Sequence, residues 1–593
     1  MGMMAERYSR GRWDLSDLIP ARSGEGMEEV FDRLEGALIA LEERCDDLSE
    51  GISAGPFREI LNLVERTSYI ARQLNGYAIL WFSEDTSDQD ALAFRERVER
   101  TLADARNRTL FFEIWWKGLN GDVASRLLQA SGGLRYYLES LRRFAPYTLS
   151  ESEERVINVK NVTGVEGMVT LYEMITNRFT FELELDGEVK TLTRSELMAY
   201  VRDPSPDRRE AAYRALFDVF SKEGGLLGQI YKYVVSDWFR ENVELRGISS
   251  PMAVRNLRND IPDDVVEILL ESCRKNASLY QRFFRLKAKL LGLDRLRRYD
   301  IYAPLQEARK EYPFEEGADL VFSSLKRFSP ELSELAERVL AEDHLDSLPR
   351  PGKDTGAFCF GVVPDKTPWV LVNYNNRAAD VATLAHELGH AIHAMMAKDH
   401  SVLTFHSSLP LAETASSFSE ILLIRLLLSE EGDPAVRRYL LAKFIDDSYV
   451  SIIRQAYFVL FEREVHSLVN GEGATTDRLA ELYMENLREQ FADSVELSEE
   501  FKWEWTMIPH LYTTPFYCYA YAFGLLLVLS LYRAYEAEGE EFVPRYLRVL
   551  SYGGSKAPIE ILEEAKIDVR DPSFWQGGFD VIAAMIDEIA ELV

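Results

Sequence analysis

The chain has 593 residues, of which 47% are hydrophobic and 28% are charged, so it can bury a large folded core. Its net charge of −30 argues against binding to nucleic acid or to anionic membranes, because both need clustered Lys and Arg. The four cysteines form no CxxC pair, and the first residues hold no apolar signal core. We therefore expect a reducing, cytoplasmic location.

Most of the chain has the periodicity of amphipathic helices. Residues 26–48, 262–293 and 477–491 place apolar side chains three and four positions apart, with charges between them. Residues 179–193 instead alternate apolar and polar side chains on either side of Asp186-Gly187, which predicts a β-hairpin. Helical spacing returns over residues 194–220.

A second β-rich stretch, residues 355–376, has two short runs with Pro364 and Asp365 between them, and it predicts a small sheet. Residues 515–532 lack charges and reach the lower length limit of a membrane span, but their crowded aromatic rings favour a buried core helix. No linker stands out. We predict a mainly α protein, with an N-terminal helical region (1–190) that ends in the hairpin and a catalytic region (191–593).

The sequence "TLAHELGHAIHAMM", residues 383–396, contains an H-E-x-x-H motif at His386, Glu387 and His390. Positions i and i+4 of a helix share one face, so two imidazoles can bind one zinc ion while Glu387 lies beside a metal-bound water. The alternative is a helix whose polar residues merely face solvent. The apolar flanks argue against it, because unpaired polar groups on a buried helix cost several kcal/mol.

A catalytic zinc site usually has three protein ligands, and the chain must supply the third after the motif. Residues 407–428 predict a second helix after Pro410, with Glu413 and Glu420 seven positions apart on one face. We favour Glu413 as the ligand and Glu420 as a partner for a ligand histidine. Solvated acids are the alternative reading of this pair, and Asp399, His400 and His406 compete as ligands. His393 is expected to be structural.

These residues resemble the thimet oligopeptidase family of zinc peptidases, and most closely oligoendopeptidase F. The resemblance includes "HELGHAIH" and "LAETASSFSE", and it covers nearly the whole chain through five further segments: "WDLSDL", the hairpin with "LTRSELMAYVRDPSPDRREAAYRAL", "RRYDIYAPL", "GAFCFG…PWVLVNYN" and "LSYGGSKAPIEILEEAKIDVRDPSFW". It implies a two-lobed helical fold with a deep channel for short unfolded peptides. It also implies that the "PWVLVNYN" run is an edge strand that pairs with the substrate backbone.

The resemblance implies one Zn²⁺ per chain, with His386, His390 and Glu413 as ligands and Glu387 as the general base. Within "IPHLYTTPFYCYAYAFG", it implies that a histidine and tyrosines act on the substrate carbonyl. We assign this role to His510 and Tyr521, then to Tyr517, because Tyr517 and Tyr521 would share a helix face. The same rings could instead be simple core residues, above all Tyr519.

The predicted activity is hydrolysis of internal bonds in short peptides, by attack of a zinc-bound water that Glu387 deprotonates. Three alternatives stay open. A metallocarboxypeptidase or dipeptidase would act only at chain ends, and a peptide-binding protein would use zinc structurally. A zinc aminopeptidase would be expected to carry a G-A-M-E-N motif, which this sequence lacks. The sequence gives no oligomeric state.

Overall fold

The computed structural model describes residues 10–20, 22, 24–185, 187–305 and 310–592. Helices dominate and the strands are short, so the mainly α prediction is confirmed. The chain forms two compact units. The first comprises Met1–Ala145, Arg309–Glu430 and Ala534–Asp568, and the second comprises Pro146–Ala308, Glu431–Arg533 and Val569–Val593. The division expected at residue 190 falls inside the second unit, and as a functional boundary it stays a prediction.

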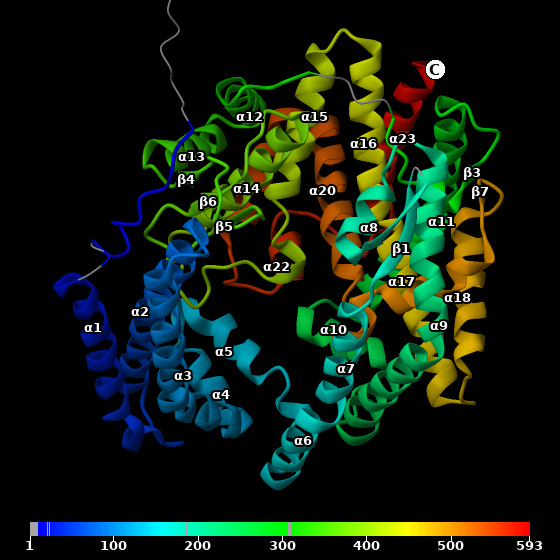
Figure 1. The fold of residues 1–593 in the computed structure, drawn as a ribbon. Helices are drawn as coiled ribbons and strands as arrows, with labels where there is room; N and C mark the ends of the chain where they lie inside the picture. The colour runs from blue at the N-terminus through cyan, green and yellow to red at the C-terminus, as the bar shows by residue number, and fades with distance from the viewer. Residues whose placement is uncertain (1–9, 21, 23, 186, 306–309, 593) are drawn as a thin grey trace, which may run out of the picture. The chain divides into compact units, whose positions relative to one another are not determined.

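The first unit contains the following helices and strands, labelled in Figure 1 where there is room: α1 (Glu25–Glu42), α2 (Ala54–Glu84), α3 (Gln89–Gly118), α4 (Gly121–Leu128), α5 (Arg135–Arg142), α12 (Phe314–Phe328), α13 (Pro330–Ala341), β4 (Leu345–Asp346), β5 (Phe358–Phe360), β6 (Trp369–Leu371), α14 (Ala378–Met396), α15 (Ser416–Glu430), α21 (Val543–Ser551) and α22 (Pro558–Glu564).

The second unit contains the remaining elements: α6 (Glu151–Thr163), α7 (Val165–Asn177), β1 (Phe181–Leu185), β2 (Glu188–Leu192), α8 (Arg194–Tyr200), α9 (Pro206–Phe239), α10 (Pro251–Asn259), α11 (Asp263–Leu290), β3 (Leu296–Arg297), α16 (Pro434–Ser451), α17 (Ile453–Asn470), α18 (Thr476–Phe491), β7 (Val495–Glu496), α19 (Pro509–Thr513), α20 (Tyr519–Glu538) and α23 (Pro572–Glu591). Helix α20 counts with this unit up to Arg533.

The predicted hairpin is present in the second unit. Strands β1 and β2 pair antiparallel, from Phe181 opposite Leu192 to Leu185 opposite Glu188. Side chains of β1 alternate between buried and exposed, and the strand packs against α9. The turn residue Gly187 has φ +85°, a conformation that glycine adopts without strain. Its predicted partner in the turn, Asp186, lies outside the described residues.

The predicted small sheet also forms, and it packs against α14 in the first unit. Strand β6 pairs antiparallel with β5 and parallel with β4, so the strand order is β4-β6-β5. The expectation that "PWVLVNYN" supplies an edge strand is therefore wrong. Its strand β6 is central and fully buried, as its unbroken run of apolar side chains indicates, and β5 lies at an edge.

The start of the chain belongs to the core of the first unit. Trp13, Leu15 and Leu18 are buried in a cluster that also contains Trp369 of β6 and side chains of α2. The indole of Trp13 donates a hydrogen bond to a buried carboxylate of α2, and the Trp369 indole donates to a backbone carbonyl near Trp13, with N–O distances of 2.7 and 2.8 Å. This segment thus helps to fix the sheet beside α14.

The apolar run 515–532 is part of the protein core, as the sequence predicts. Helix α20 begins at Tyr519, and most of its side chains up to Tyr532 are buried. Among the described residues, no helix combines the length and apolar character that crossing a membrane would require.

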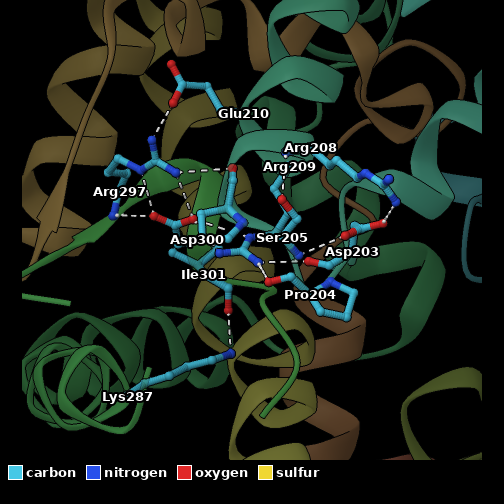
Figure 2. A network of polar contacts seen from close by, with 11 residues as sticks. Asp203, Pro204, Ser205, Arg208, Arg209, Glu210, Lys287, Arg297, Asp300 and Ile301 are labelled. Atoms are coloured by element: carbon cyan, nitrogen blue, oxygen red, sulfur yellow. Dashed lines mark hydrogen bonds and ion pairs between the residues drawn. The ribbon is translucent and has the colours of Figure 1, made fainter. Parts of the chain in front are cut away.

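A buried ion-pair network explains the "RRYDIYAPL" segment of the second unit (Figure 2). The carboxylate of Asp300, which is fully buried, accepts hydrogen bonds from Arg209 of α9 and from Arg297 at N–O distances of 2.8 Å. Lys287 of α11 donates to the carbonyl of Ile301 at 2.7 Å. Because a buried carboxylate is costly unless paired, these bonds hold the segment against α9 and α11.

Candidate metal and catalytic site

Helix α14 and the turn before α15 bring the three predicted metal ligands together. The Nε2 atoms of His386 and His390 lie 3.4 and 3.5 Å from Oε2 of Glu413. One ligand atom from each residue lies within 4.8 Å of the other two, and the two imidazole rings are 4.8 Å apart. Two imidazole nitrogens and one carboxylate oxygen form a donor set that suits Zn²⁺ and leaves a position free for water.

The close approach of these two elements depends on Gly389. A Cβ atom at this position would lie 2.5 Å from Cα of Ser416 and 2.6 Å from the carbonyl oxygen of Ala415. Only a residue without a side chain lets the start of α15 pack this closely against α14. Gly389 therefore permits the position of Glu413.

The predicted start of the second helix needs a correction. Residues Leu409–Leu411 form a 3-10 turn, and α15 begins only at Ser416, so Glu413 lies in the turn before the helix. The carbonyl of Glu413 already accepts a helical hydrogen bond from the amide of Ser417, at 3.1 Å. The backbone of Glu413 is therefore fixed by the first turn of α15, although the residue lies outside the helix.

Two further residues hold the predicted ligands in place. Glu420, which the sequence suggested for this role, contacts Nδ1 of His386 at 2.6 Å and leaves Nε2 directed toward Glu413. Ser416 donates a hydrogen bond from Oγ to Oε2 of Glu413, also at 2.6 Å. This role of Ser416 was not predicted from the sequence, although the Glu-x-x-Ser spacing at a helix start is a signal for it.

Burial and the neighbouring acids shift the pKa values of two side chains of α14, His386 and Glu387. Burial acts to lower the pKa of His386, but the hydrogen bond with Glu420 and the charge of Glu413 outweigh it and raise this pKa to about 9. Glu387 is buried, and burial raises its pKa to about 7 despite the nearby His386. The backbone amide of Cys359, on the edge strand β5, donates a hydrogen bond to Glu387.

The competing ligand candidates do not join this cluster among the described residues. His393 is buried, and burial lowers its pKa to about 4, in keeping with a structural histidine. Nε2 of His400 contacts the carbonyl of Ser551 at 2.8 Å. Burial also lowers the pKa of His406 to about 4.

The predicted downstream residues form their own group in the second unit. The hydroxyl of Tyr521 lies 3.3 Å from Nε2 of His510, and the ring of Tyr517 stacks on the His510 imidazole at 5.6 Å. Tyr517 and Tyr521 are 5.3 Å apart, although Tyr517 lies in the turn before α20 and not on the helix. Tyr519 is fully buried, and its hydroxyl accepts a hydrogen bond from Asn259 at 2.8 Å.

Two buried residues hold the turn that carries Tyr517 through hydrogen bonds to its backbone. Phe516 has φ +59°, which is strained for a side chain of this size, and its amide donates to Oε1 of Glu462 on α17 at 2.8 Å. The carbonyl of Pro515 accepts a hydrogen bond from Arg255 of α10 at 3.1 Å. Sequence spacing gave no signal for either contact, since both join residues far apart in the chain.

The chain matches two protein-family descriptions: "Peptidase family M3" over residues 199–581 and "Oligopeptidase F" over residues 119–181. Oligopeptidase PepF of Bacillus subtilis is 25% identical and covers 99% of this chain, which spans 88% of the relative. An oligoendopeptidase F homolog of Borreliella burgdorferi is 26% identical, with 98% of each chain covered.

Solved structures show the same fold. A protein from Chlamydophila abortus superposes with a TM-score of 0.90 at 23% identity, over 98% of both chains. The oligoendopeptidase-F from Enterococcus faecium has a TM-score of 0.69 at 21% identity, over 95% of this chain and 99% of the other.

Proposed function

Because the chain belongs to peptidase family M3 and is a metalloendopeptidase, we propose that it uses one Zn²⁺ ion to hydrolyse internal bonds of short, unfolded peptides. His386, His390 and Glu413 would hold the ion. The convergence of their three ligand atoms beside the buried Glu387 is the observation that carries this proposal. A zinc ion in such a site supplies a Lewis acid that polarises the scissile carbonyl and acidifies water.

Glu387 acts as the general base in this proposal. Its carboxylate would accept a proton from the attacking water and then return it to the leaving amine. The hydrogen bond from the backbone amide of Cys359 helps to hold the carboxyl group in place. Glu420 and Ser416 orient His386 and Glu413, so that the ligand atoms need little rearrangement to bind the ion.

Strand β5 is the element of the small sheet that we assign to substrate binding. It lies at the edge of the sheet, and Cys359 at its centre contacts Glu387. An extended peptide that adds to this edge would bind through backbone hydrogen bonds, with little demand on its sequence. The names of the relatives, an oligopeptidase and an oligoendopeptidase, support short peptides as substrates.

His510 and Tyr521 would donate hydrogen bonds to the oxyanion that forms on the substrate carbonyl, with Tyr517 as the further candidate. Burial lowers the pKa of His510, so this imidazole is neutral near pH 7. Tyr521 is 41% exposed, so part of this residue reaches solvent.

The test is cleavage of a nine-residue peptide that is acetylated at its N-terminus and amidated at its C-terminus, with products read by mass spectrometry. We expect internal cleavage that 1,10-phenanthroline abolishes and added Zn²⁺ restores, with about one zinc per chain by metal analysis. Release of single residues or dipeptides from an unblocked peptide, with the blocked peptide intact, would favour an exopeptidase. A zinc-loaded protein that cleaves no peptide would favour a binding protein and overturn the proposal.

A further inference from the structure

A hollow in the first unit is lined by none of the three predicted metal ligands and takes no part in the proposed chemistry. It has a volume of about 350 Å³ and is lined by side chains of α1, α2, α3 and α5, helices that Figure 1 places in the N-terminal part of the unit. Its apolar wall includes Leu41, Ala105 and Phe112, which are buried. The remaining wall is polar.

Three polar residues of α2 form a stripe along this hollow. Ser68, Arg72 and Asn75 are four and three positions apart, so they share one face of the helix, and each is half-buried. None of the three side chains has a hydrogen bond or ion pair with any described residue. The Tyr137 hydroxyl of α5 lines the same hollow and, within the part of the chain that the structure describes, also has no partner.

The charge of Arg72 makes this arrangement unusual. Burial lowers the pKa of its guanidinium group, and no acid pairs with this cation among the described residues. Nearby arginines of α3 are paired: Arg97 with Glu28 at 2.6 Å and Arg108 with Glu35 at 2.7 Å.

Glu113 is the one acid that lines the hollow in the described chain, and its carboxylate contacts Lys117 at 2.9 Å. Arg106 adds a second guanidinium to the lining, and it too has no ion pair among the described residues. In a chain of net charge −30, the hollow is thus locally cationic. A half-buried cation without a counter-charge is costly, and an anionic ligand would remove that cost.

We propose that this hollow binds the carboxylate group of a small organic acid or of a peptide C-terminus. The planar guanidinium of Arg72 matches a carboxylate in two parallel hydrogen bonds, and Ser68, Asn75 and Tyr137 supply neutral donors around it. The apolar wall accommodates an aliphatic body, which inorganic phosphate lacks. The volume suits a ligand the size of one or two amino-acid residues.

The test uses titration calorimetry with N-acetyl-leucine as the probe and N-acetyl-leucinamide as its uncharged match. The protein carries His386→Ala and His390→Ala, so that a carboxylate cannot bind to a metal ion there. We expect the acid to bind and the amide not to bind. Adding Arg72→Gln should weaken binding about tenfold or more, since a charge-assisted hydrogen bond contributes about 1.5–3 kcal/mol. Arg97→Gln, whose side chain pairs outside the hollow, should leave binding unchanged.

Further probes separate the sources of the carboxylate. A pentapeptide with a free C-terminus that binds more tightly than N-acetyl-leucine would identify a peptide end, and the reverse order would identify a free acid. Equal binding of the acid and the amide, equal binding to the Arg72→Gln protein, or tighter binding of inorganic phosphate would each overturn the proposal. The unfolding temperature of every variant, measured without probe, controls for misfolding. None of these results depends on peptidase activity.

Discussion

The two candidate catalytic groups of this protein are positioned in different ways. His386, Glu387 and His390 belong to one regular helix, and Gly389 and Ser416 bring Glu413 to them over a short distance in sequence. His510, Tyr517 and Tyr521 are distributed over α19, a strained turn and the start of α20. Buried residues of other helices hold that turn.

This difference shows which kind of site is determined by the local geometry of a single helix. Helix periodicity alone puts the predicted metal ligands of α14 on one face, so that group needs only a close neighbour to complete it. No helical periodicity determines the turn that carries Tyr517. Its conformation depends on contacts with Glu462 and Arg255. Substitutions in the first group should therefore act directly on metal or chemistry, and those around the second should act at a distance.

The largest effect is expected from Glu387→Gln in the first group. The amide keeps the shape of the side chain but cannot accept the proton, so kcat should fall by about 10²–10⁴-fold. Metal content should stay near one per chain, because Glu387 is not a ligand in our proposal. Stopped assays on a quenched fluorescent peptide, together with metal analysis, measure both. Wild-type turnover in this variant would remove Glu387 from the mechanism.

Gly389→Ala tests the close contact that completes the first group. The added methyl group would overlap Cα of Ser416, so α15 must shift and take Glu413 with it. We expect loss of zinc on dialysis and a decrease of about 1–3 kcal/mol in unfolding free energy. Gly36→Ala on α1, where no heavy atom lies within 4 Å of the new Cβ, should retain zinc and stability. If Gly389→Ala also retains zinc, the contact is not needed for the site.

More of the first group than of the second could be predicted from the sequence, because sequence patterns report local structure. His386, His390, Glu420 and the burial of Tyr519 follow from helical spacing and apolar flanks, which are local properties. The unbroken apolar run of β6 indicates a central strand. Its neighbour β4 has only two residues, so the sequence gives no pattern for this partner.

The roles of Gly389, Glu462 and Asp300 were beyond this reasoning. Glu462 and Asp300 depend on atoms that the fold brings from distant segments, Phe516 and Arg209, and Gly389 depends on the close packing of Ser416 from the next helix. No period in the sequence encodes such contacts.

Tyr521→Phe tests the second group directly. Removal of one oxyanion donor should lower kcat by about 10²–10³-fold and leave the zinc content unchanged. Tyr519→Phe is the matched control, because that hydroxyl is buried against Asn259. The control should lose about 1–3 kcal/mol of stability, since the Asn259 amide is left unpaired, but should keep its kcat. An unchanged kcat in Tyr521→Phe would exclude this hydroxyl from the chemistry.

Glu462 variants test whether the second group is held from a distance. Glu462→Leu removes the acceptor for the Phe516 amide, and we expect kcat to fall about tenfold at constant zinc content, as the turn relaxes. Glu462→Gln keeps an oxygen acceptor and should restore most of the activity. Equal kcat values in both variants would show that the catalytic group does not need this bond.

The pH dependence of stability separates the two groups. Burial raises the pKa of Glu462 from 4.5 to about 8, so the folded protein binds this proton more tightly than the unfolded chain does. Its contribution to stability is therefore complete below about pH 4.5 and is lost as the pH rises through 8, by at most about 1.4 kcal/mol per pH unit.

Calorimetry from pH 5 to 9 should thus show wild type losing stability relative to Glu462→Gln, which has no proton to release. Zinc affinity should change in the opposite sense, because His386 must lose its proton to bind metal and low pH opposes this. Low pH would then weaken zinc binding by the first group, and high pH would lower the stability that Glu462 contributes beside the second. A constant stability difference between wild type and Glu462→Gln across this range would show that Glu462 is ionised in the folded protein.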